Sequence, residues 1–574
     1  MAYMSIRALK ARLRSRFPRL WRILIYAWWS VRITTPWTES AFFRGLRRLR
    51  REASPGAMPA EGRKKILFFA TRQERDQLAM LTTLAWSLQR RGHEVLTLGC
   101  DQALTSSCNS GNYPALNPWS CRTCHLYARH THALSDIHTE WLSEFLPQGA
   151  KERACELVDA VDPERYPALE YRGYAIGRIV RHSVGHFLRT DQITAEPSSV
   201  AKYRDWLISA VWLVDACELL VEKHGPDTIV LLNGLFAPES IMLEVAKRQN
   251  VRVVTWEGAY RPESNFFAHD RPTDMADPAM WPVFGEIPLT EEENAEFDAY
   301  LSEKESGGGY LIDYFPDINE SAAAVCSEFG IDRSRKIAVL FPNITWDSTL
   351  FEKKGAFALM AEWIESSIEW FATRPEAQLV IRIHPAEVVL SGADRDSVVE
   401  LIEKRFPQLP SNIVIIPPGS GASSYVLMSL ADCGLVYGST TGIELGVRGV
   451  PVIVAGDVYY RGLGLSLDPK TPEEYDAALD EVMSGRVHKN DPARVEAWRR
   501  YAYYAIFRAP VPLRQIRYER VGDLPTLRYQ SLTELDEGQE PNLDVVCRGI
   551  VEGTPILAAS AARVLAMDKA EPSY

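Results

Sequence analysis

The chain has 574 residues, of which 46% are hydrophobic, 24% charged and 10% aromatic, and this composition excludes a disordered, collagen-like or disulfide-scaffold protein. Its net charge of −11 combines +13 over residues 1–65, from 16 Lys and Arg against 3 Asp and Glu, with −24 on the remainder; so acidic a body argues against nucleic acid as a partner. At roughly 100–250 residues per domain, the length predicts two large domains plus extensions, and the low share of cysteine without an evident secretory signal favours a reducing cytosolic setting.

Residues 1–52 are predicted to associate with a membrane surface. Apolar residues recur every three or four positions over 6–24, and arginines occupy much of the rest. The uncharged stretch 23–31 contains two tryptophans but is too short for a bilayer, which needs about 20 apolar residues. A basic helix of this kind suits an anionic membrane, so we expect a peripheral protein on the inner face of the cytoplasmic membrane. The alternatives are a basic helix docked on the acidic body and a disordered tail.

Two series of short apolar runs alternate with helical patterns through most of the remaining chain. The first series predicts strands at 66–70, 95–99, 228–232 and 251–256, with helices at 75–91 and 238–250 and a long, less regular middle. The second predicts strands at 337–341, 379–383, 413–416, 434–437 and 450–454, with helices at 356–371, 396–405, 423–430 and 442–448. Such alternation predicts parallel sheets covered by helices, hence an α/β fold of two Rossmann-like, doubly wound domains that face each other across a cleft.

The domain boundaries follow from these series. We expect four parts: the basic amphipathic segment 1–52, a first Rossmann-like domain over 63–285 for the acceptor, a second over 286–490 for the donor nucleotide, and C-terminal helices with an extension over 491–574. Ligands of such folds bind at the carboxyl ends of the strands, so residues that follow the predicted strands are the candidates for chemistry.

Four local motifs stand at such strand ends. In the first, Arg382 precedes His384-Pro385, and an imidazole there can bind a phosphate or act as a general acid. In the second, Ser439 and Thr440 introduce a helix that carries Glu444 one turn in; the hydroxyls suit a phosphate and Glu444 suits ribose hydroxyls. Taken alone, each motif also fits an ordinary loop connection or helix cap.

The other two motifs are a carboxylate and an arginine. Glu257, in Trp256-Glu257-Gly258, ends the last strand of the first domain, where it could act as a general base. Arg461 lies in the loop after the last predicted strand of the second domain and suits a phosphate or a carboxylate. Both side chains could equally belong to ion pairs.

Together these motifs resemble the capsule polysaccharide biosynthesis family of GT-B glycosyltransferases, which is related to bacterial sialyl- and Kdo-transferases. That group has an acid-acid-Gly, a His-Pro and a Ser-Ser/Thr motif; here Glu257-Gly258, His384-Pro385 and Ser439-Thr440 follow in the same order. The first acid is replaced by Trp256, so the base has alternatives, which are Asp76, Glu74 and Asp270. The likeness is best over 335–470 and fainter over 228–270.

The resemblance implies a sugar-nucleotide-dependent transferase, which we expect to be inverting; the sequence has no convincing Asp-x-Asp metal-nucleotide motif, and this fits a metal-independent transfer. It would transfer a sugar from a nucleotide-sugar donor, often CMP-linked, to a capsule or other surface polysaccharide or glycolipid acceptor. In this reading Glu257 is the base, His384 with Arg382 stabilises the leaving phosphate, and Ser439 and Thr440 hold it. No G-x-x-x-x-G-K-[ST] motif is present, which argues against ATP hydrolysis. Transfer of a polyol phosphate from a CDP-activated donor and a non-catalytic scaffold of the same fold are the alternatives.

A cysteine cluster follows the second predicted strand. Cys100-x7-Cys108-x12-Cys121-x2-Cys124 lies in a stretch rich in Asn, Pro, Ser and Gly. Four thiolates can form a structural zinc site or hold an iron–sulfur cluster, and we expect zinc ahead of iron–sulfur. The C-x-x-C-H at 121–125 also matches a c-type haem attachment pattern, which would need export. Free thiols packed in a loop are the alternative.

Overall fold

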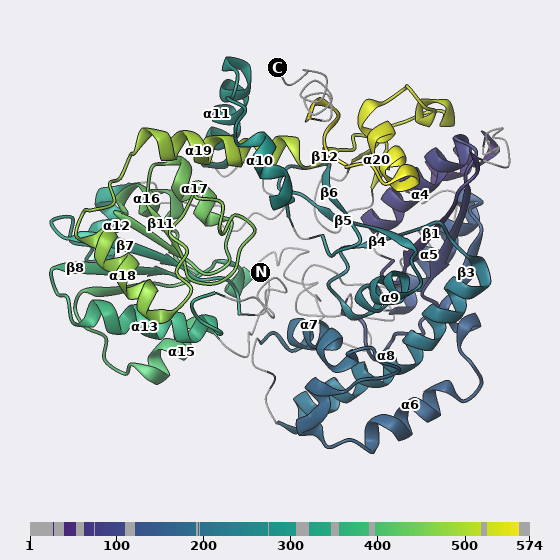
Figure 1. The fold of residues 1–574 in the computed structure, drawn as a ribbon, viewed down its shortest axis with the longest axis horizontal. Coiled ribbons are helices and arrows are strands. Elements are labelled where there is room, and N and C mark those ends of the chain that lie inside the picture. Colours follow the sequence, from purple (N-terminus) through teal and green to yellow (C-terminus); the bar gives the residue numbers. More distant parts are fainter. Residues whose placement is uncertain are drawn as a thin grey trace, which may run out of the picture.

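Two large β-sheets, each flanked by helices, dominate the part of the chain that the structure describes (Figure 1). The structure, a computed structural model, describes residues 27, 40–52, 62–73, 75–109, 121–190, 193, 196–273, 275–305, 321–345, 355–389, 397–517 and 525–561. The first sheet has the strand order β12-β6-β5-β4-β1-β2-β3. Its strands are β1 (Lys65–Ala70), β2 (Glu94–Gly99), β3 (Thr139–Trp141), β4 (Thr228–Leu232), β5 (Arg252–Gly258), β6 (Ser264–His269) and β12 (Val511–Pro512).

The second sheet has the order β11-β10-β7-β8-β9. Its strands are β7 (Lys336–Phe341), β8 (Ala377–Arg382), β9 (Ile413–Ile416), β10 (Cys433–Val436) and β11 (Val452–Val454), all parallel. Counted along the chain within each sheet, this order is 3-2-1-4-5, and the five parallel strands of the first sheet have the same order. Both sheets are therefore Rossmann-type, which confirms the predicted α/β class.

Strand order reverses at one place in each sheet, and this place predicts where a ligand binds. The reversal falls between β1 and β4 in the first sheet and between β7 and β10 in the second. The loops that leave neighbouring strands diverge there, one to each face of the sheet, and open a crevice at the carboxyl edge. We refer to these places as the first and second switch points.

All nine predicted strands are present, with ends within two residues of those expected. They were visible in the sequence because central parallel strands are buried on both faces and consist of continuous apolar runs. β4, for example, is buried at every position. The short edge strand β3 and the antiparallel strands β6 and β12 were not predicted, since they carry no such signature.

Helices cover both sheets. Those around the first sheet are α4 (Arg75–Arg90), α5 (Cys121–Ser135), α6 (Ala150–Asp159), α7 (Ile176–Leu188), α8 (Pro197–His224) and α9 (Ala237–Arg248). Those that follow in the chain are α10 (Trp281–Phe284), α11 (Glu291–Glu305), α12 (Ala322–Phe329), α13 (Met360–Ala372), α14 (Ala386–Val389), α15 (Val398–Arg405), α16 (Ser424–Leu430), α17 (Thr441–Val447) and α18 (Pro472–Met483).

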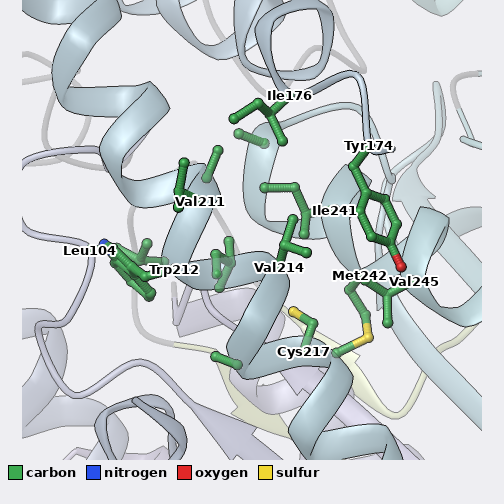
Figure 2. Packing of buried hydrophobic residues seen from close by; sticks show 14 of the residues in the cluster. Leu104, Tyr174, Ile176, Val211, Trp212, Val214, Cys217, Ile241, Met242 and Val245 are labelled. Atoms are coloured by element: carbon green, nitrogen blue, oxygen red, sulfur yellow. The ribbon is translucent and has the colours of Figure 1, made fainter. Parts of the chain in front are cut away.

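The middle that the sequence left irregular contains the long helix α8. Its residues Val211, Val214 and Cys217 are buried with Ile241 and Met242 of α9 (Figure 2). α6, α7 and α9 all contact α8, so its apolar residues are not confined to one stripe. A helix covered on several sides loses the one-faced periodicity by which amphipathic helices are recognised, and this explains the missed prediction.

Helix α3 (Ala41–Leu49) belongs to the core of the first domain. Its N-cap Ser40 accepts a hydrogen bond from the backbone N–H of Phe43, and its four large apolar side chains are 0% exposed. The buried apolar residues of α3 are Phe42, Phe43, Leu46 and Leu49. The prediction that all of 1–52 lies on a membrane is therefore corrected for the apolar face of α3, which packs inside the protein. Residues 1–39, apart from Ala27, lie outside the described residues.

None of the helices in the described ranges is long and apolar enough to cross a membrane.

The C-terminal part joins both domains. α19 (Pro492–Tyr503) packs on α17 of the second domain, and the chain then returns to the first sheet, where β12 pairs with β6 (Figure 1). A short hairpin of β13 (Ile516–Arg517) and β14 (Thr526–Leu527) follows, and then α20 (Pro541–Glu552). The carbonyl of Ile550 in α20 accepts a hydrogen bond of 2.9 Å from Thr228 Oγ1 on β4. The predicted extension 491–574 thus contributes a strand and a helix to the first domain.

Candidate functional site

A connected set of polar side chains occupies the first switch point. Asn233, directly after β4, donates through Nδ2 to Glu257 Oε2 at the end of β5, at 2.6 Å. Arg72, directly beyond β1, donates through Nη2 to Asn233 Oδ1 at 3.4 Å and through Nε to Glu239 Oε1 at 3.0 Å. Glu239 is 1% exposed and also accepts from Thr71 Oγ1. The set brings the predicted Glu257 together with four strand-end or helix-start residues that the sequence analysis did not name.

Glu257 is placed to act outside the sheet. β5 is buried through its middle and becomes partly exposed at its end, so the carboxylate emerges at the carboxyl edge. Asp270, an alternative base, accepts from the backbone N–H of Val253 near the start of β5, which is the opposite end of that strand. Asp270 is therefore not at this site. Glu74 lies outside the described residues, and only the backbone of Asp76 is described, in α4.

His384 follows β8 in the second domain. Its Nδ1 accepts the backbone N–H of Ala386 at 3.0 Å, and the ring is half-buried. A neutral imidazole whose Nδ1 accepts a hydrogen bond carries its proton on Nε2. The loop therefore presents His384 in the tautomer that donates from Nε2, which is the one needed to contact or protonate a phosphate oxygen.

Arg382 supports this loop from inside. The side chain is 3% exposed, and its Nη1 and Nη2 donate to the carbonyls of Pro417 and Ser420 at 2.7 and 3.2 Å. Burial lowers the pKa of Arg382 to about 10, which leaves it protonated at neutral pH. Arg382 thus ties the end of β8 to the loop after β9, close to His384, and this gives it a positioning role.

Ser439 and Thr440 lie at the second switch point. Gly438, two residues after β10, donates its backbone N–H to Oδ1 of Asn343 from the loop after β7, at 3.1 Å. Ser439 Oγ accepts the backbone N–H of Thr441, and the carbonyl of Ser439 accepts the hydroxyl of buried Tyr460 at 2.7 Å. The two switch-point strands are therefore linked by Asn343, and the backbone of Ser439 is fixed from both sides.

The Glu444 carboxylate contacts other side chains of the second domain. Its Oε1 accepts the hydroxyl of Tyr425 at 3.4 Å, and Lys304 of α11 and Arg448 of α17 lie close enough to attract it. Burial of the carboxyl raises the pKa of Glu444, and these two cations oppose the rise. To bind ribose hydroxyls as predicted, the Glu444 carboxylate would have to accept them in addition to the Tyr425 hydroxyl or in its place.

The guanidinium of Arg461 donates hydrogen bonds to backbone carbonyls. Its Nη1 donates to the carbonyls of Val454 and Gly456 at 2.8 and 2.7 Å, and its Nη2 donates to the carbonyls of Asp468 and Pro469. Four carbonyls bound by one guanidinium hold the loop after β11 in a fixed shape. In this arrangement Arg461 shapes the loop, and donor binding by Arg461 stays a prediction.

The four clustered cysteines come from three places around the end of β2. Cys100 directly follows β2, Cys121 and Cys124 lie in the first turn of α5, and Cys108 precedes residues 110–120, which are outside the described chain. Burial, helped by the nearby thiols of Cys108 and Cys121, raises the pKa of the Cys100 thiol to about 12. Within the described ranges, no three His, Cys, Asp or Glu side chains are placed to hold one metal ion. Zinc or an iron–sulfur cluster stays a prediction.

Two asparagines of the site were missed in the sequence. Asn233 is the first residue after β4, and Asn343 is the second after β7. Asn343 binds Gly438 across the second switch point. Asn233 binds Glu257 of the neighbouring strand β5, and its Oδ1 accepts from Arg72 across the first switch point. A search for polar residues just beyond each buried strand would have found both.

The fold and these clusters define an α/β protein with two Rossmann-type domains, each with polar side chains gathered at its switch point. No protein-family model and no curated protein matches the chain. Among solved structures it is similar to a KpsC β-Kdo 2,4 transferase of Thermosulfurimonas dismutans, with 12% identity, 54% of this chain and 88% of that chain covered, and a TM-score of 0.32.

Two further solved structures cover more of the chain. The UDP-GlcNAc 2-epimerase of Neisseria meningitidis is 10% identical, with 76% of this chain and 97% of that chain covered and a TM-score of 0.24. The glycosyltransferase VinC is 12% identical, with 77% and 96% covered and a TM-score of 0.24. The Kdo transferase and VinC are glycosyltransferases, the class of protein that the sequence motifs resemble. The fold assignment rests on the strand order of the two sheets, and the activity is argued from the site.

Proposed function

We propose that the protein is a glycosyltransferase that transfers a sugar from a CMP-linked donor to a capsule or other surface glycan or glycolipid. The observation that carries this proposal is the placement of Glu257, His384 and Ser439 directly at or beyond the carboxyl ends of strands in two Rossmann-type sheets. A carboxylate in one domain, with an imidazole and hydroxyls in the other, supplies the groups that such a transfer needs.

In the proposed reaction, Glu257 takes the proton of the acceptor hydroxyl as its oxygen bonds to the anomeric carbon. The bond from that carbon to the phosphate oxygen breaks, and the electron pair leaves with the nucleotide. His384 donates from Nε2 to the departing phosphate, which neutralises the developing charge. The hydroxyls of Ser439 and Thr440 add donors to the same phosphate. The attack from the opposite face inverts the anomeric centre, and no step calls for a metal ion.

The acceptor end is proposed to lie at a membrane. The basic segment 1–39 precedes α3, and α3 with the turn that follows it, Arg50–Glu52, exposes five arginines while the apolar face of α3 is buried. Those arginines are Arg44, Arg47, Arg48, Arg50 and Arg51. Near anionic lipid each such charge contributes about 1 kcal/mol, and salt screens it. A peripheral position on the inner face of the cytoplasmic membrane would bring the enzyme to a lipid-linked acceptor.

A nucleotide panel tests the donor class. A ligand that binds only the folded state stabilises it by about 2.7 kcal/mol at a hundredfold excess over Kd. CMP should therefore raise Tm more than CDP, UDP or GDP, and Ser439→Ala should lose part of that rise. Ser429→Ala is the matched control, because Ser429 is exposed on α16 and lies outside the site.

Product analysis then decides the reaction. With a CMP-sugar donor, wild type should release CMP, and Glu257→Gln should keep the Tm rise while losing transfer, because an amide cannot accept the proton. Stabilisation by CDP alone, with a polyol phosphate moved to the acceptor, would replace the proposal with phosphate transfer. No stabilisation by any of the four nucleotides would favour the scaffold.

A further inference from the structure

We infer that Asn233 is a positioning residue for Glu257, an inference that rests on the proposed function. Asn233 holds the Glu257 carboxylate at the edge of the first sheet, and Arg72 holds Asn233. The three residues leave three neighbouring strands, β1, β4 and β5, at the first switch point. The contact sequence Arg72 to Asn233 to Glu257 runs across the carboxyl edge of that sheet.

The orientation of the Asn233 amide is set by its other partners. Its Oδ1 accepts the backbone N–H of Leu235 at 3.0 Å and Nη2 of Arg72 at 3.4 Å. Two donors on the oxygen exclude the flipped amide, which would place an NH₂ against an N–H and a guanidinium. The amide NH₂ must therefore face Glu257 Oε2, at 2.6 Å.

The amide is also held rigidly by the backbone. Asn233 is 5% exposed, its N–H donates to the carbonyl of Trp256 at 2.9 Å, and its carbonyl accepts the N–H of Thr273 at 2.8 Å. Glu257 Oε1 accepts the N–H of Gly258 at 3.2 Å. Each carboxylate oxygen thus has a fixed donor, so the plane of the carboxylate is set before an acceptor arrives.

An amide at this position suits a general base better than a cation would. A guanidinium bound directly to Glu257 would stabilise the charged carboxylate strongly and weaken it as a proton acceptor. Here Arg72 Nε donates to Oε1 of Glu239 at 3.0 Å, and the neutral amide of Asn233 lies between the Arg72 guanidinium and the Glu257 carboxylate. The arrangement orients the base while it limits the loss of basicity.

Two substitutions test this role kinetically once the donor panel has supplied an assay. Asn233→Ala should lower kcat by about tenfold to a hundredfold with little change in donor KM, because the base is misoriented and donor binding lies in the other domain. Asn233→Asp keeps the shape but sets a second carboxylate against Glu257, so the acidic limb of the kcat/KM profile should move to higher pH. Asn412→Ala is the control: this buried asparagine binds three carbonyls in the second domain and should affect stability without moving the profile.

A second readout needs no substrate. In Asn233→Asp the facing carboxylates cannot both ionise cheaply, so their shared proton is lost only at raised pH and the Tm deficit against wild type should grow from about pH 5 to about pH 8. Adding Glu257→Gln should abolish that growth, because one of the two charges is gone. A constant deficit in both variants would overturn the contact.

The outcomes separate the two hypotheses. If wild type turns over none of the donors, the proposed function fails, and the inference fails with it. If wild type is active while Asn233→Ala keeps its kcat and Asn233→Asp keeps the wild-type pH profile, the inference alone is overturned. A normal kcat with a low Tm would likewise reduce Asn233 to a structural residue.

Discussion

The burial of helix α3 predicts how far the chain can be shortened from its N-terminal side before the first domain loses stability. Phe43 is 0% exposed, and its ring centroid lies 5.4, 5.2 and 4.9 Å from those of Phe42, Tyr127 and His130. An aromatic side chain buries about 150–250 Å², worth roughly 4–6 kcal/mol at about 25 cal/mol per Å². Phe43→Ala should therefore cost about 3–5 kcal/mol, a large part of the roughly 5–15 kcal/mol that stabilises a typical domain.

Deletion variants extend the same calculation. Removing 1–39 leaves α3 and its N-cap Ser40 in place, so that variant keeps the buried side chains of α3. Removing 1–52 deletes all four buried apolar side chains of α3, which together are worth roughly 10–20 kcal/mol, so that variant should not fold. A deletion to residue 52 is thus unsuitable for separating membrane binding from folding.

Urea unfolding and vesicle sedimentation check both consequences. Arg51→Gln is the control, because Arg51 lies in the turn directly after α3 and is exposed, and its replacement should change stability by no more than about 0.5 kcal/mol. The 1–39 deletion should release the folded protein from anionic vesicles, and the binding of intact chain should weaken as salt rises. A 1–52 deletion with wild-type stability would refute the assignment of α3 to the core, and vesicle binding that survives the 1–39 deletion would place the membrane contact elsewhere.

Three further predictions concern the second domain and the cysteines. His384→Ala should lower turnover by about a hundredfold or more with Tm nearly unchanged, since the ring is half-buried in a loop; wild-type turnover would remove it from the mechanism. Because burial raises the folded-state pKa of Glu444 above its ordinary 4.5, the folded chain holds the extra proton and stability falls as pH rises above 4.5; Glu444→Gln should flatten that fall in Tm. If the clustered cysteines bind zinc, elemental analysis should find about one zinc per chain, lost in Cys121→Ser; metal-free protein with four alkylatable thiols there would exclude the site.

The sequence predicted the parallel strands because their burial on both faces demands apolar residues at every position, as in β4. The edges of the first sheet could not be predicted in this way. β3 is three residues long and half-buried, and β12 is a two-residue strand whose partner β6 lies over 240 residues earlier. Pairing at such a distance depends on tertiary packing, which leaves no local pattern.

The candidate site likewise contains residues that the sequence could predict and residues that it could not. Glu257, His384 and Ser439 were found because strand ends can be located and polar residues there stand out. The backbone contacts of Arg461 could not be predicted, since carbonyl partners leave no side-chain pattern in the sequence. Asn233 was missed because its importance comes from a contact with the neighbouring strand, and that contact exists only in the folded sheet.

The return of the chain to its first sheet has a consequence for synthesis on the ribosome. β6 emerges with its outer edge unpaired, and its partner β12 is made about 240 residues later. At about 5–20 residues per second, that interval lasts roughly 12–50 seconds. During it the growing chain exposes an open strand edge, together with the surface of β4 and α4 that α20 later covers. The nascent protein should therefore be bound by chaperones that recognise such edges until β12 and α20 have been made, and a fragment ending near residue 285 should keep the exposed edge permanently.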